Sequence, residues 1–516
     1  SPTFGTAVAM LVSMEVFSFC CSIALATSLF LWLLKLVATS GDNPGKRRPP
    51  RPWTLPIIGS LHHVLRGLPH HTFSKLSRRY GPLVFLKFGE VPTVVVSSAE
   101  AAEVVMRSKD LTFATRPRSV MLDIVGCNGR GILLAPYGDH WREMRKICIV
   151  ELLSAKQVKR MESIKAEEVA HLVRHLTESS AMGRTVNLSH KMSELTNNII
   201  ARALFGAKCR QQGEYLRELD QVIKLVGGFS LVDLFPSSRI VRWFDVGERN
   251  MRKSYGRIQR IIAHIIEERK AARAASVCST TDEDLLDVLL RLQADDSLPV
   301  PLTEETIGVV IFDIFAGGTE TSSTTMEWAM SELLKNPEVL SKVHLELKEV
   351  LGSEREIITN ADMGELRYMR MVIKESLRLH PPGPLLAPRQ AREDCEIMDY
   401  HIARGTIVHI NVFAISRDPR YWDNPEAFNP ERFQDSHVDF KGSNFEFTPF
   451  GAGRRQCPGI LFGTSTLEIV LANLLYHFNW LLPEGSSPMS LDMSEKFGMT
   501  TGRRSDLQLI PARYAL

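Results

Sequence analysis

One cysteine of this 516-residue chain stands in a setting suited to metal binding. The segment 450–459 reads FGAGRRQCPG, in which Cys457 follows two arginines and precedes a Pro-Gly pair. Nearby cations and backbone N–H groups favour a thiolate over a thiol, and the N-terminal end of an apolar helix expected over Ile460–Leu475 adds to this effect. A cysteinate on haem iron favours O–O cleavage. A lone cysteine is more often a buried structural thiol, so this interpretation depends on the surrounding residues.

A second candidate for chemistry lies in the helix expected over residues 303–335. Asp313, Gly317 and Thr321 recur every four residues and therefore face one side. A pair of adjacent glycines beginning at Gly317 costs about 1 kcal/mol per residue in helix propensity, which a purely structural helix would avoid. Thr321 and Glu320 could pass protons from solvent to a reacting oxygen. Thr321 could instead bond back to the carbonyl four residues earlier, or do both.

Two further motifs place charged side chains on predicted helices. Trp141 and Arg145 are four residues apart, so an indole N–H and a guanidinium can reach one anion. Glu375 and Arg378 are three apart, and Arg432 could complete a buried cluster with them. Removing one member of a desolvated cluster costs roughly 3–5 kcal/mol. We therefore assign these last three residues to the fold rather than to chemistry.

Taken together, these motifs resemble those of the cytochrome P-450 superfamily, the haem-thiolate monooxygenases. The Cys457 loop, with the pattern F-x-x-G-x-R-x-C-x-G, is similar to the family's haem-binding loop. The sequences of residues 374–382 and 449–459 look most like those of the large plant group that oxidises specialised metabolites. The other motifs occur in the family's order: the W-x-x-x-R helix at Trp141, the oxygen-binding helix at Ala316–Thr321, the E-x-x-R helix at Glu375 and the arginine-bearing segment Pro430–Phe433.

The resemblance implies a mainly α fold with small β-sheets, the haem-thiolate monooxygenase fold, preceded by one N-terminal transmembrane helix. It implies haem b as cofactor and O₂ as co-substrate, with Cys457 as the metal ligand. Thr321 and Glu320 are then the catalytic residues, and Arg116 is a weaker candidate for haem contact. The cofactor-binding residues are expected to be Trp141, Arg145, Gly317, Arg389, Phe450, Arg455 and Gly459.

The implied reaction inserts one oxygen atom into a small lipophilic substrate, such as a terpenoid or related plant metabolite. Because the chain has no flavin or nicotinamide motif, electrons must come from NADPH through a separate flavoprotein reductase, and a b5-type cytochrome is a further candidate partner. A haem-thiolate isomerase or dehydratase acting without O₂ remains an alternative, as does a non-catalytic haem sensor or carrier. The resemblance places the substrate pocket at Val120–Cys127, Leu225–Phe235, Val309–Phe315, Leu385–Ala387 and Phe497–Thr501, and the reductase-facing cations at Arg142, Lys146, Lys156, Lys159, Arg160 and Arg454.

The N-terminus predicts a membrane anchor. From Val16 to Leu34 there are 19 residues without formal charge, enough to span a bilayer core of about 30 Å. A basic cluster at 46–51 follows, so the positive-inside rule leaves the rest of the chain in the cytosol. The resemblance to the microsomal form of the family implies the endoplasmic reticulum membrane. A cleaved signal peptide would have a shorter apolar region, with its basic residues first. We predict an anchor over 1–40, a basic, proline-rich hinge over 41–59 and a single haem-binding catalytic domain over 60–516.

Composition agrees with this organisation. With 44% hydrophobic and 23% charged residues, the chain is typical of a globular protein. The net charge of +3 is accounted for by residues 1–51, which hold five basic and two acidic residues, so nothing indicates nucleic-acid binding. None of the eight cysteines forms a C-x-x-C pair, which argues against a disulfide framework or zinc site.

The elements that must position these residues are mainly helical. Strands are expected at 83–88 and 93–96 around a turn at 89–92, with short β pieces near 397–409. A long irregular segment is predicted over 411–460, and such segments in compact domains are usually functional. Helices are predicted at 140–152, 155–178, 190–205, 249–275, 303–335, 337–351 and 365–379.

Overall fold

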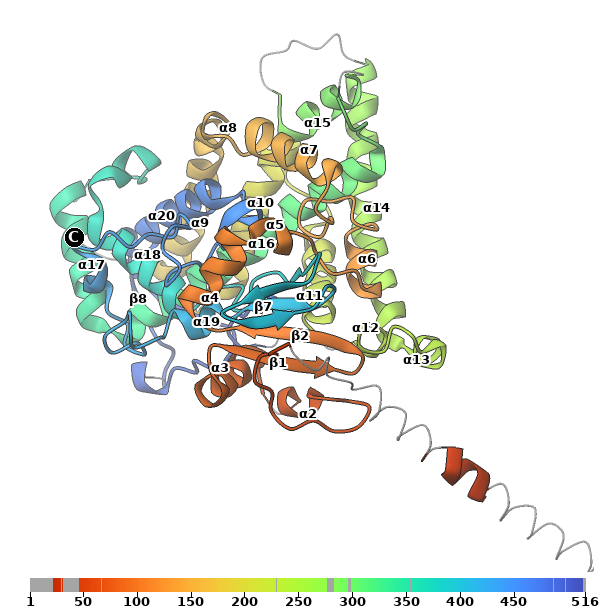
Figure 1. Cartoon of the computed structure of the whole chain (residues 1–516). Helices are drawn as coiled ribbons and strands as arrows, with labels where there is room; N and C mark the ends of the chain where they lie inside the picture. Colours follow the sequence, from red (N-terminus) through yellow and green to blue (C-terminus); the bar gives the residue numbers. More distant parts are fainter. Residues whose placement is uncertain are drawn as a thin grey trace, which may run out of the picture.

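A computed structural model describes residues 22–28, 30, 46–65, 67–228, 230–275, 283–295, 298–352, 354–485, 487–496 and 498–513. Helices form most of the molecule, and the largest sheet lies toward one end of it, beside α2 (Leu61–Val64) and α3 (Pro69–Tyr80) (Figure 1). The predicted mainly α fold with small sheets is confirmed.

The long helices lie close to their predicted ranges. The helix predicted over 155–178 is divided at Met161, and a helix at Gln212–Gly227 was not predicted. The predicted irregular segment 411–460 is confirmed, since it contains only short helical turns. Besides α2 and α3, the helices are α4 (Ala99–Glu103), α5 (Asp110–Phe113), α6 (Val120–Val125), α7 (Asp139–Ile147), α8 (Ala155–Arg160), α9 (Glu162–Ala181), α10 (Leu188–Phe205), α11 (Gln212–Gly227), α12 (Leu231–Leu234), α13 (Arg239–Phe244), α14 (Val246–Ala275), α15 (Leu285–Gln293), α16 (Glu304–Lys335), α17 (Pro337–Leu351), α18 (Arg367–Leu379), α19 (Val412–Ile415) and α20 (Ile460–His477), with shorter or π-type turns at Val104–Ser108, Cys148–Leu152, Asn360–Glu365, Pro430–Phe433, Gly453–Arg455 and Pro488–Ser490.

The strands form three small sheets with the orders β1-β2-β7-β4, β3-β9-β8 and β5-β6. The predicted hairpin is confirmed, because Leu83 pairs with Val96 and Phe88 with Val91 across an antiparallel ladder. β2 then pairs in parallel with β7, which joins the N-terminal part of the chain to the region after residue 400. The strands are β1 (Leu83–Phe88), β2 (Val91–Val96), β3 (Val186–Asn187), β4 (Arg389–Gln390), β5 (Cys395–Ile397), β6 (Tyr400–Ile402), β7 (Ile407–Ile410), β8 (Phe478–Leu481) and β9 (Gln508–Arg513).

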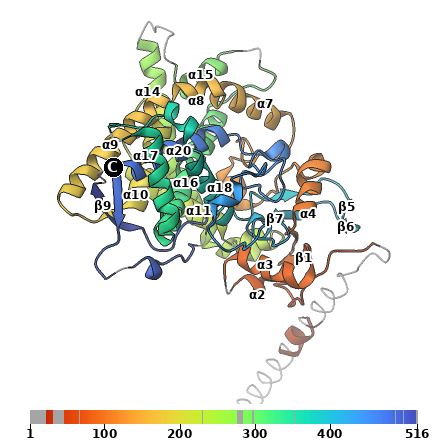
Figure 2. The ribbon, with the colours of Figure 1, turned by 90° about the vertical axis from the view of Figure 1, so that its left-hand side faces the viewer.

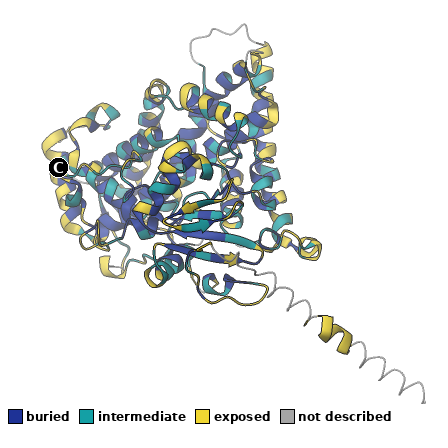
Figure 3. Ribbon diagram, in the orientation of Figure 1, coloured by how far each residue is buried: buried dark blue, intermediate teal, exposed yellow. Residues whose placement is uncertain are grey.

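The core is built around α16. This helix lies in the middle of the helical part in both views (Figures 1 and 2) and packs against α10, α18 and α20. Its surroundings are mostly buried (Figure 3). The Thr303 side chain caps its first turn by accepting a hydrogen bond from the Thr306 N–H at 3.1 Å.

Most of the predicted anchor lies outside the described residues. Residues 22–28 and 30 are helical and exposed. Within the part of the chain that the structure describes, one helix, α20, is long and apolar enough to cross a membrane. However, 67% of it is buried in the protein, so we interpret α20 as a core helix.

A buried ion cluster fixes the irregular segment. Arg378 donates to both carboxylate oxygens of Glu375, at 2.7 and 2.8 Å, and both side chains are fully buried. Arg432 donates to the same carboxylate at 3.0 Å. Arg378 also donates to Ser416 O and Pro425 O, at 2.7 and 2.8 Å. The cluster thus ties α18 to the segment that leads to Cys457.

We predict that Glu375→Gln destabilises the protein by roughly 3–5 kcal/mol, because two buried guanidinium groups lose their counter-charge. Chemical unfolding measures the free energy, and haem content measures the consequence for the loop. The control is Arg107→Ala, which breaks an exposed pair with Glu103 (side chains 61% and 43% exposed) and should cost less than about 1 kcal/mol. Equal effects of the two substitutions would contradict the assignment.

Candidate functional site

Cys457 lies at the end of a tight loop that leads into α20. Its backbone N–H donates to Phe450 O at 3.0 Å, and the Gly459 N–H hydrogen-bonds the thiol. Gly453 in this loop has φ +69°, and a Cβ there would lie 2.1 Å from Met106 O. The loop therefore requires glycine at this position.

The Cys457 thiol combines two properties that suit a ligand. Burial raises its pKa, although the Gly459 N–H and the charge of Arg145 oppose that shift. The residue is nevertheless exposed, so a thiol whose pKa is raised by its surroundings still has accessible surface. Metal binding removes the thiol proton, because the thiolate is the ligand form.

The middle of α16 also faces open space. Gly317 and Thr321 are exposed although most of the helix around them is buried. A Cβ on Gly317 would meet no atom within 4 Å, whereas one on Gly318 would lie 3.1 Å from the Ile200 side chain. The two glycines therefore differ: Gly318 allows close packing with α10, and Gly317 leaves room beside the helix.

Thr321 makes the local bond that its residue type favours. Its hydroxyl donates to Gly317 O at 2.7 Å, as helical threonine commonly does. The hydroxyl oxygen still has lone pairs that can accept a hydrogen bond. Its proton can reach another group only when the bond to Gly317 O is exchanged.

The spacing predicts that Asp313 faces the same side of the helix as Gly317 and Thr321, but its side chain binds a neighbouring loop. Its Oδ2 accepts hydrogen bonds from Ile132 N at 2.6 Å and Leu133 N at 3.0 Å. Burial raises the pKa of Asp313 to about 6, against the effect of these two N–H donors. The side chain holds the 131–133 loop instead of sharing the accessible face of Gly317 and Thr321.

Glu320 points toward the C-terminal part of the chain. The Thr500 hydroxyl donates to its Oε1 at 3.5 Å. Burial raises the pKa of Glu320, and the charge of Lys496 partly offsets this. Lys496 in turn pairs with Asp220 at 2.6 Å, and both of these side chains are partly exposed. Glu320 is therefore half-buried beside an ion pair that reaches solvent.

The predicted haem-contacting cations gather beside the Cys457 loop. Arg145 donates to Gln456 O at 2.6 Å. The Arg455 guanidinium lies 4.2 Å from the Trp141 ring centroid and donates to Ala114 O at 2.6 Å. The Trp141 indole N–H donates to a backbone carbonyl at 3.1 Å, so in this structure it is used locally.

Two further arginines complete this group. Arg389 is buried, donating to Asp110 at 2.9 Å and to Ala452 O at 2.9 Å. Arg116 is also buried, and its guanidinium donates to Ala387 O and Pro388 O, at 2.7 and 2.8 Å. We call Arg116, Arg145, Arg389 and Arg455 the arginine cluster.

The arginine cluster carries more positive than negative charge. The described contacts give these four guanidinium groups one carboxylate partner, Asp110. Burial, with repulsion from Arg389 and Arg145, lowers the pKa of Arg455 to about 9. A bound group with carboxylates would relieve this repulsion. The two propionates of haem b supply such charge, so these residues fit that cofactor.

Some of the segments predicted to line the pocket contact one another directly. A Cβ on Gly227 would lie 2.4 Å from Met499 N, so the end of α11 contacts the 498–501 segment directly. Ile311 and Met121 are buried core residues, and Phe312 packs edge-on against Tyr255 at 5.0 Å. Phe229 and Phe497 lie outside the described residues.

Sequence reasoning missed Asp110 and the role of Asp313. Asp110 accepts from Arg389 and from the Arg454 N–H at 2.7 Å, which joins the helix α5 to the Cys457 loop. Nothing in its sequence neighbourhood marks it, because its partners lie 279 and 344 residues away.

Three features occur together in this helical fold: the buried Glu–Arg–Arg cluster, the open space beside Gly317 in α16, and the Cys457 loop. This combination is that of a haem-thiolate protein. The chain belongs to the cytochrome P450 family, whose profile matches residues 49–505. It is therefore a monooxygenase that binds haem b, uses O₂ and takes electrons from a reductase partner.

Several known proteins are similar over nearly their whole length. Desmethyl-deoxy-podophyllotoxin synthase of Sinopodophyllum hexandrum is 46% identical, covering 96% of this chain and 97% of that protein. 5-Epiaristolochene 1,3-dihydroxylase of Nicotiana tabacum is 44% identical (94% and 96%), as is germacrene A hydroxylase of Barnadesia spinosa (96% and 97%). A zebrafish cytochrome P450 solved with abiraterone has a TM-score of 0.74 and 26% identity, covering 87% of this chain and 99% of that one.

Proposed function

We propose that this chain hydroxylates a small lipophilic metabolite of the terpenoid class. The observation that carries the proposal is the open space beside Gly317 and Thr321 in an otherwise mostly buried helix. Such a site suits a substrate with few polar groups. The relatives named for hydroxylating 5-epiaristolochene and germacrene A support a terpenoid substrate.

The proposal is tested by turnover of the purified protein with a plant NADPH-dependent reductase and a panel of terpene hydrocarbons. We expect an oxygenated product that requires both NADPH and O₂. Rearrangement of an oxygenated substrate without either would favour an isomerase. Haem binding without turnover of any substrate would favour a sensor or carrier.

We assign the haem contacts as follows. Cys457 would bind the haem iron, and the arginine cluster, with Trp141, would hold the propionates. Gly317, Phe450 and Gly459 would shape the surfaces that face the haem. When bound, the haem supplies the oxygen-activating chemistry, and these side chains hold and orient it.

Cys457→His should abolish the strongly red-shifted band of the ferrous–CO complex while some haem remains, because imidazole replaces the thiolate. The absorption spectrum of the reduced, CO-treated protein measures this. Cys148→Ser is the control, since Cys148 is a buried thiol in the neighbouring turn after α7. A retained band in Cys457→His, or its loss in Cys148→Ser, would contradict the assignment.

Thr321 and Glu320 are proposed to deliver protons to the reacting oxygen. Thr321→Val keeps the shape but removes the hydroxyl, so product should fall roughly 10-fold or more while hydrogen peroxide rises. Glu320→Gln should act in the same direction. NADPH consumption, product and peroxide are measured together.

Thr325→Val is the matched control for this measurement. Thr325 lies one turn further along α16, is buried, and donates a similar back-bond to Thr321 O at 2.9 Å. In the Thr325→Val protein, NADPH consumption should remain coupled to product formation, without a rise in hydrogen peroxide. Unchanged product and peroxide in Thr321→Val would remove the proton-delivery role and favour the isomerase alternative.

We propose that the chain is anchored in the endoplasmic reticulum membrane, with residues 60–516 as one cytosolic catalytic domain and a b5-type cytochrome as a second electron donor. Figure 1 shows α12 and α13 at the lower edge of the molecule, on the same side as the β1–β2 hairpin. There, Ile240, Trp243 and Phe244 are 72%, 81% and 73% exposed. An apolar surface of this kind is typical of a membrane contact.

Deleting residues 1–40 should leave haem content and folding intact but reduce membrane association, with part of it retained through α13. Adding Trp243→Ser and Phe244→Ser to the truncated protein should remove the retained part, as measured by flotation with liposomes. Leu345→Ser, which changes an exposed leucine (55%) on α17, is the control. Equal flotation of the truncated protein with and without the α13 changes would contradict the membrane contact.

A further inference from the structure

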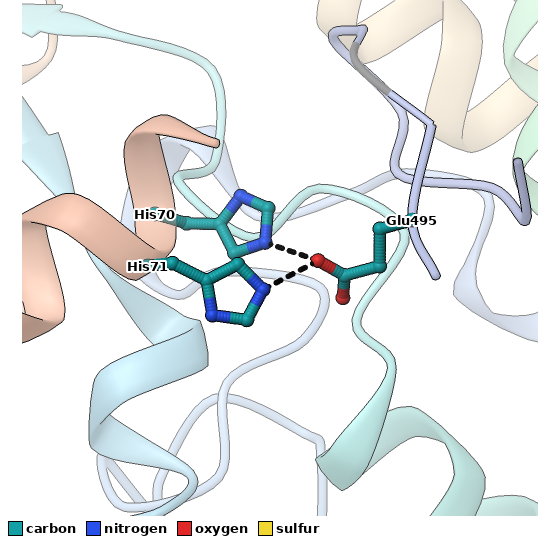
Figure 4. Close-up of side chains that lie close together, drawn as sticks. All are labelled: His70, His71 and Glu495. Carbon is teal, nitrogen blue, oxygen red and sulfur yellow. Dashed lines mark hydrogen bonds and ion pairs between the residues drawn. The ribbon is translucent and has the colours of Figure 1, made fainter. Parts of the chain in front are cut away.

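Two histidines near the start of the described chain and a glutamate near its end form a cluster outside the Cys457 loop. His70 and His71 occupy the first turn of α3, after Pro69, and Glu495 lies in the C-terminal segment that follows α20 and β8. The Nε2 atoms of His70 and His71 lie 2.8 and 2.7 Å from the same oxygen, Oε2 of Glu495 (Figure 4).

The three side chains converge on one point. Their ligand atoms all lie within 4.8 Å of one another, and among the described residues no other trio of His, Cys, Asp or Glu is grouped in this way. Two imidazole nitrogens and one carboxylate oxygen form a donor set that Zn²⁺ uses with a fourth position left for water. The side chains of His70 and Glu495 are 4% and 10% exposed, and that of His71 is 43% exposed, so the cluster opens to solvent on the His71 side.

The ligand atoms are held in place before any ion binds. The Phe413 ring lies edge-on to both imidazoles, with centroids 4.8 and 4.5 Å away. The Asn411 side chain donates to His70 O at 3.2 Å. The guanidinium of nearby Arg417 pairs with Glu426 at 3.1 Å and donates a hydrogen bond to the Leu379 carbonyl.

The spacing of the ligand atoms is already close to the spacing that a bound ion requires. Tetrahedral binding at 2.0–2.2 Å separates ligand atoms by about 3.4 Å, which small rotations of the three side chains can provide.

We propose that His70, His71 and Glu495 bind a divalent transition-metal ion, with Zn²⁺ as the expected ion. The ion replaces the two N–H···O contacts and joins α3 to the segment containing Glu495, 424 residues further along the chain. This segment is also held by an antiparallel bridge between Glu495 and Arg503. The site shares no residue with the Cys457 loop or the arginine cluster, and the bound ion stabilises the contact between α3 and the Glu495 segment.

The test uses the full-length holoenzyme, treated with a chelator, dialysed and titrated calorimetrically with ZnCl₂. We expect one Zn²⁺ per haem, and at least about 10-fold weaker binding in both His71→Ala and Glu495→Gln. X-ray absorption at the zinc edge should show nitrogen and oxygen ligands at about 2.0–2.2 Å. Zn²⁺ should raise the thermal midpoint of the wild-type protein but not that of His71→Ala.

The chain offers a matched control in its other adjacent histidine pair. The rings of His62 and His63 lie 3.9 Å apart, but their nitrogens contact Gly59 O and Trp53 O. His63→Ala should bind Zn²⁺ like the wild type. The ferrous–CO band checks that each variant is folded, and His71→Ala, at a half-exposed position, decides the result if Glu495→Gln does not retain haem. Lack of stoichiometric binding by the wild type, or wild-type affinity in His71→Ala, would overturn the proposal.

Discussion

The Glu375 carboxylate, buried between two guanidinium groups, holds the long irregular part of this protein in place. Segments such as 416–432 have few ladder hydrogen bonds of their own, so their backbone carbonyls must be satisfied by side chains. Arg378 does this directly by donating to Ser416 O, Pro425 O and, at 3.1 Å, Ala427 O. Arg378 can lie in the core only because Glu375 neutralises it. The loop bearing Cys457 follows from this arrangement, since the chain reaches it through these residues.

The arginine cluster has the opposite electrostatic character. The Glu375 group brings one carboxylate and two guanidinium groups into a compact, hydrogen-bonded arrangement. Beside Cys457, by contrast, only one of four guanidinium groups, that of Arg389, has a carboxylate partner among the described contacts, Asp110. Their remaining donors satisfy backbone carbonyls, which balances hydrogen bonds but not charge. A dianionic cofactor bound beside these arginines would relieve this repulsion, and its binding would then stabilise the loops that the arginines hold together.

The sequence was informative where a single motif fixes both position and role. Glu375, Arg378 and the hairpin at 83–96 could be predicted because their partners are local or follow from a spacing rule. The cysteine loop was identified through its glycines and helix start. Asp110 and Asp313 could not be found in this way, because each is defined by contacts across more than a hundred residues. Asp313 also shows that equal spacing along a helix does not give equal surroundings: one turn separates a side chain that binds a loop from a glycine that faces open space.

The segment after residue 494 contacts α3, α11 and α16, which lie far apart in the sequence. Glu495 contacts α3, and the next residue, Lys496, pairs with Asp220 on α11 at 2.6 Å. Thr500 contacts Glu320, and Trp328 on the same helix donates to Thr501 O at 2.9 Å. The surroundings of the Glu320 carboxyl are therefore set by a segment that is held at its other end by the histidine pair. Since burial and the Lys496 charge act in opposite directions on the pKa of Glu320, any change that moves this segment alters that pKa without touching α16 itself.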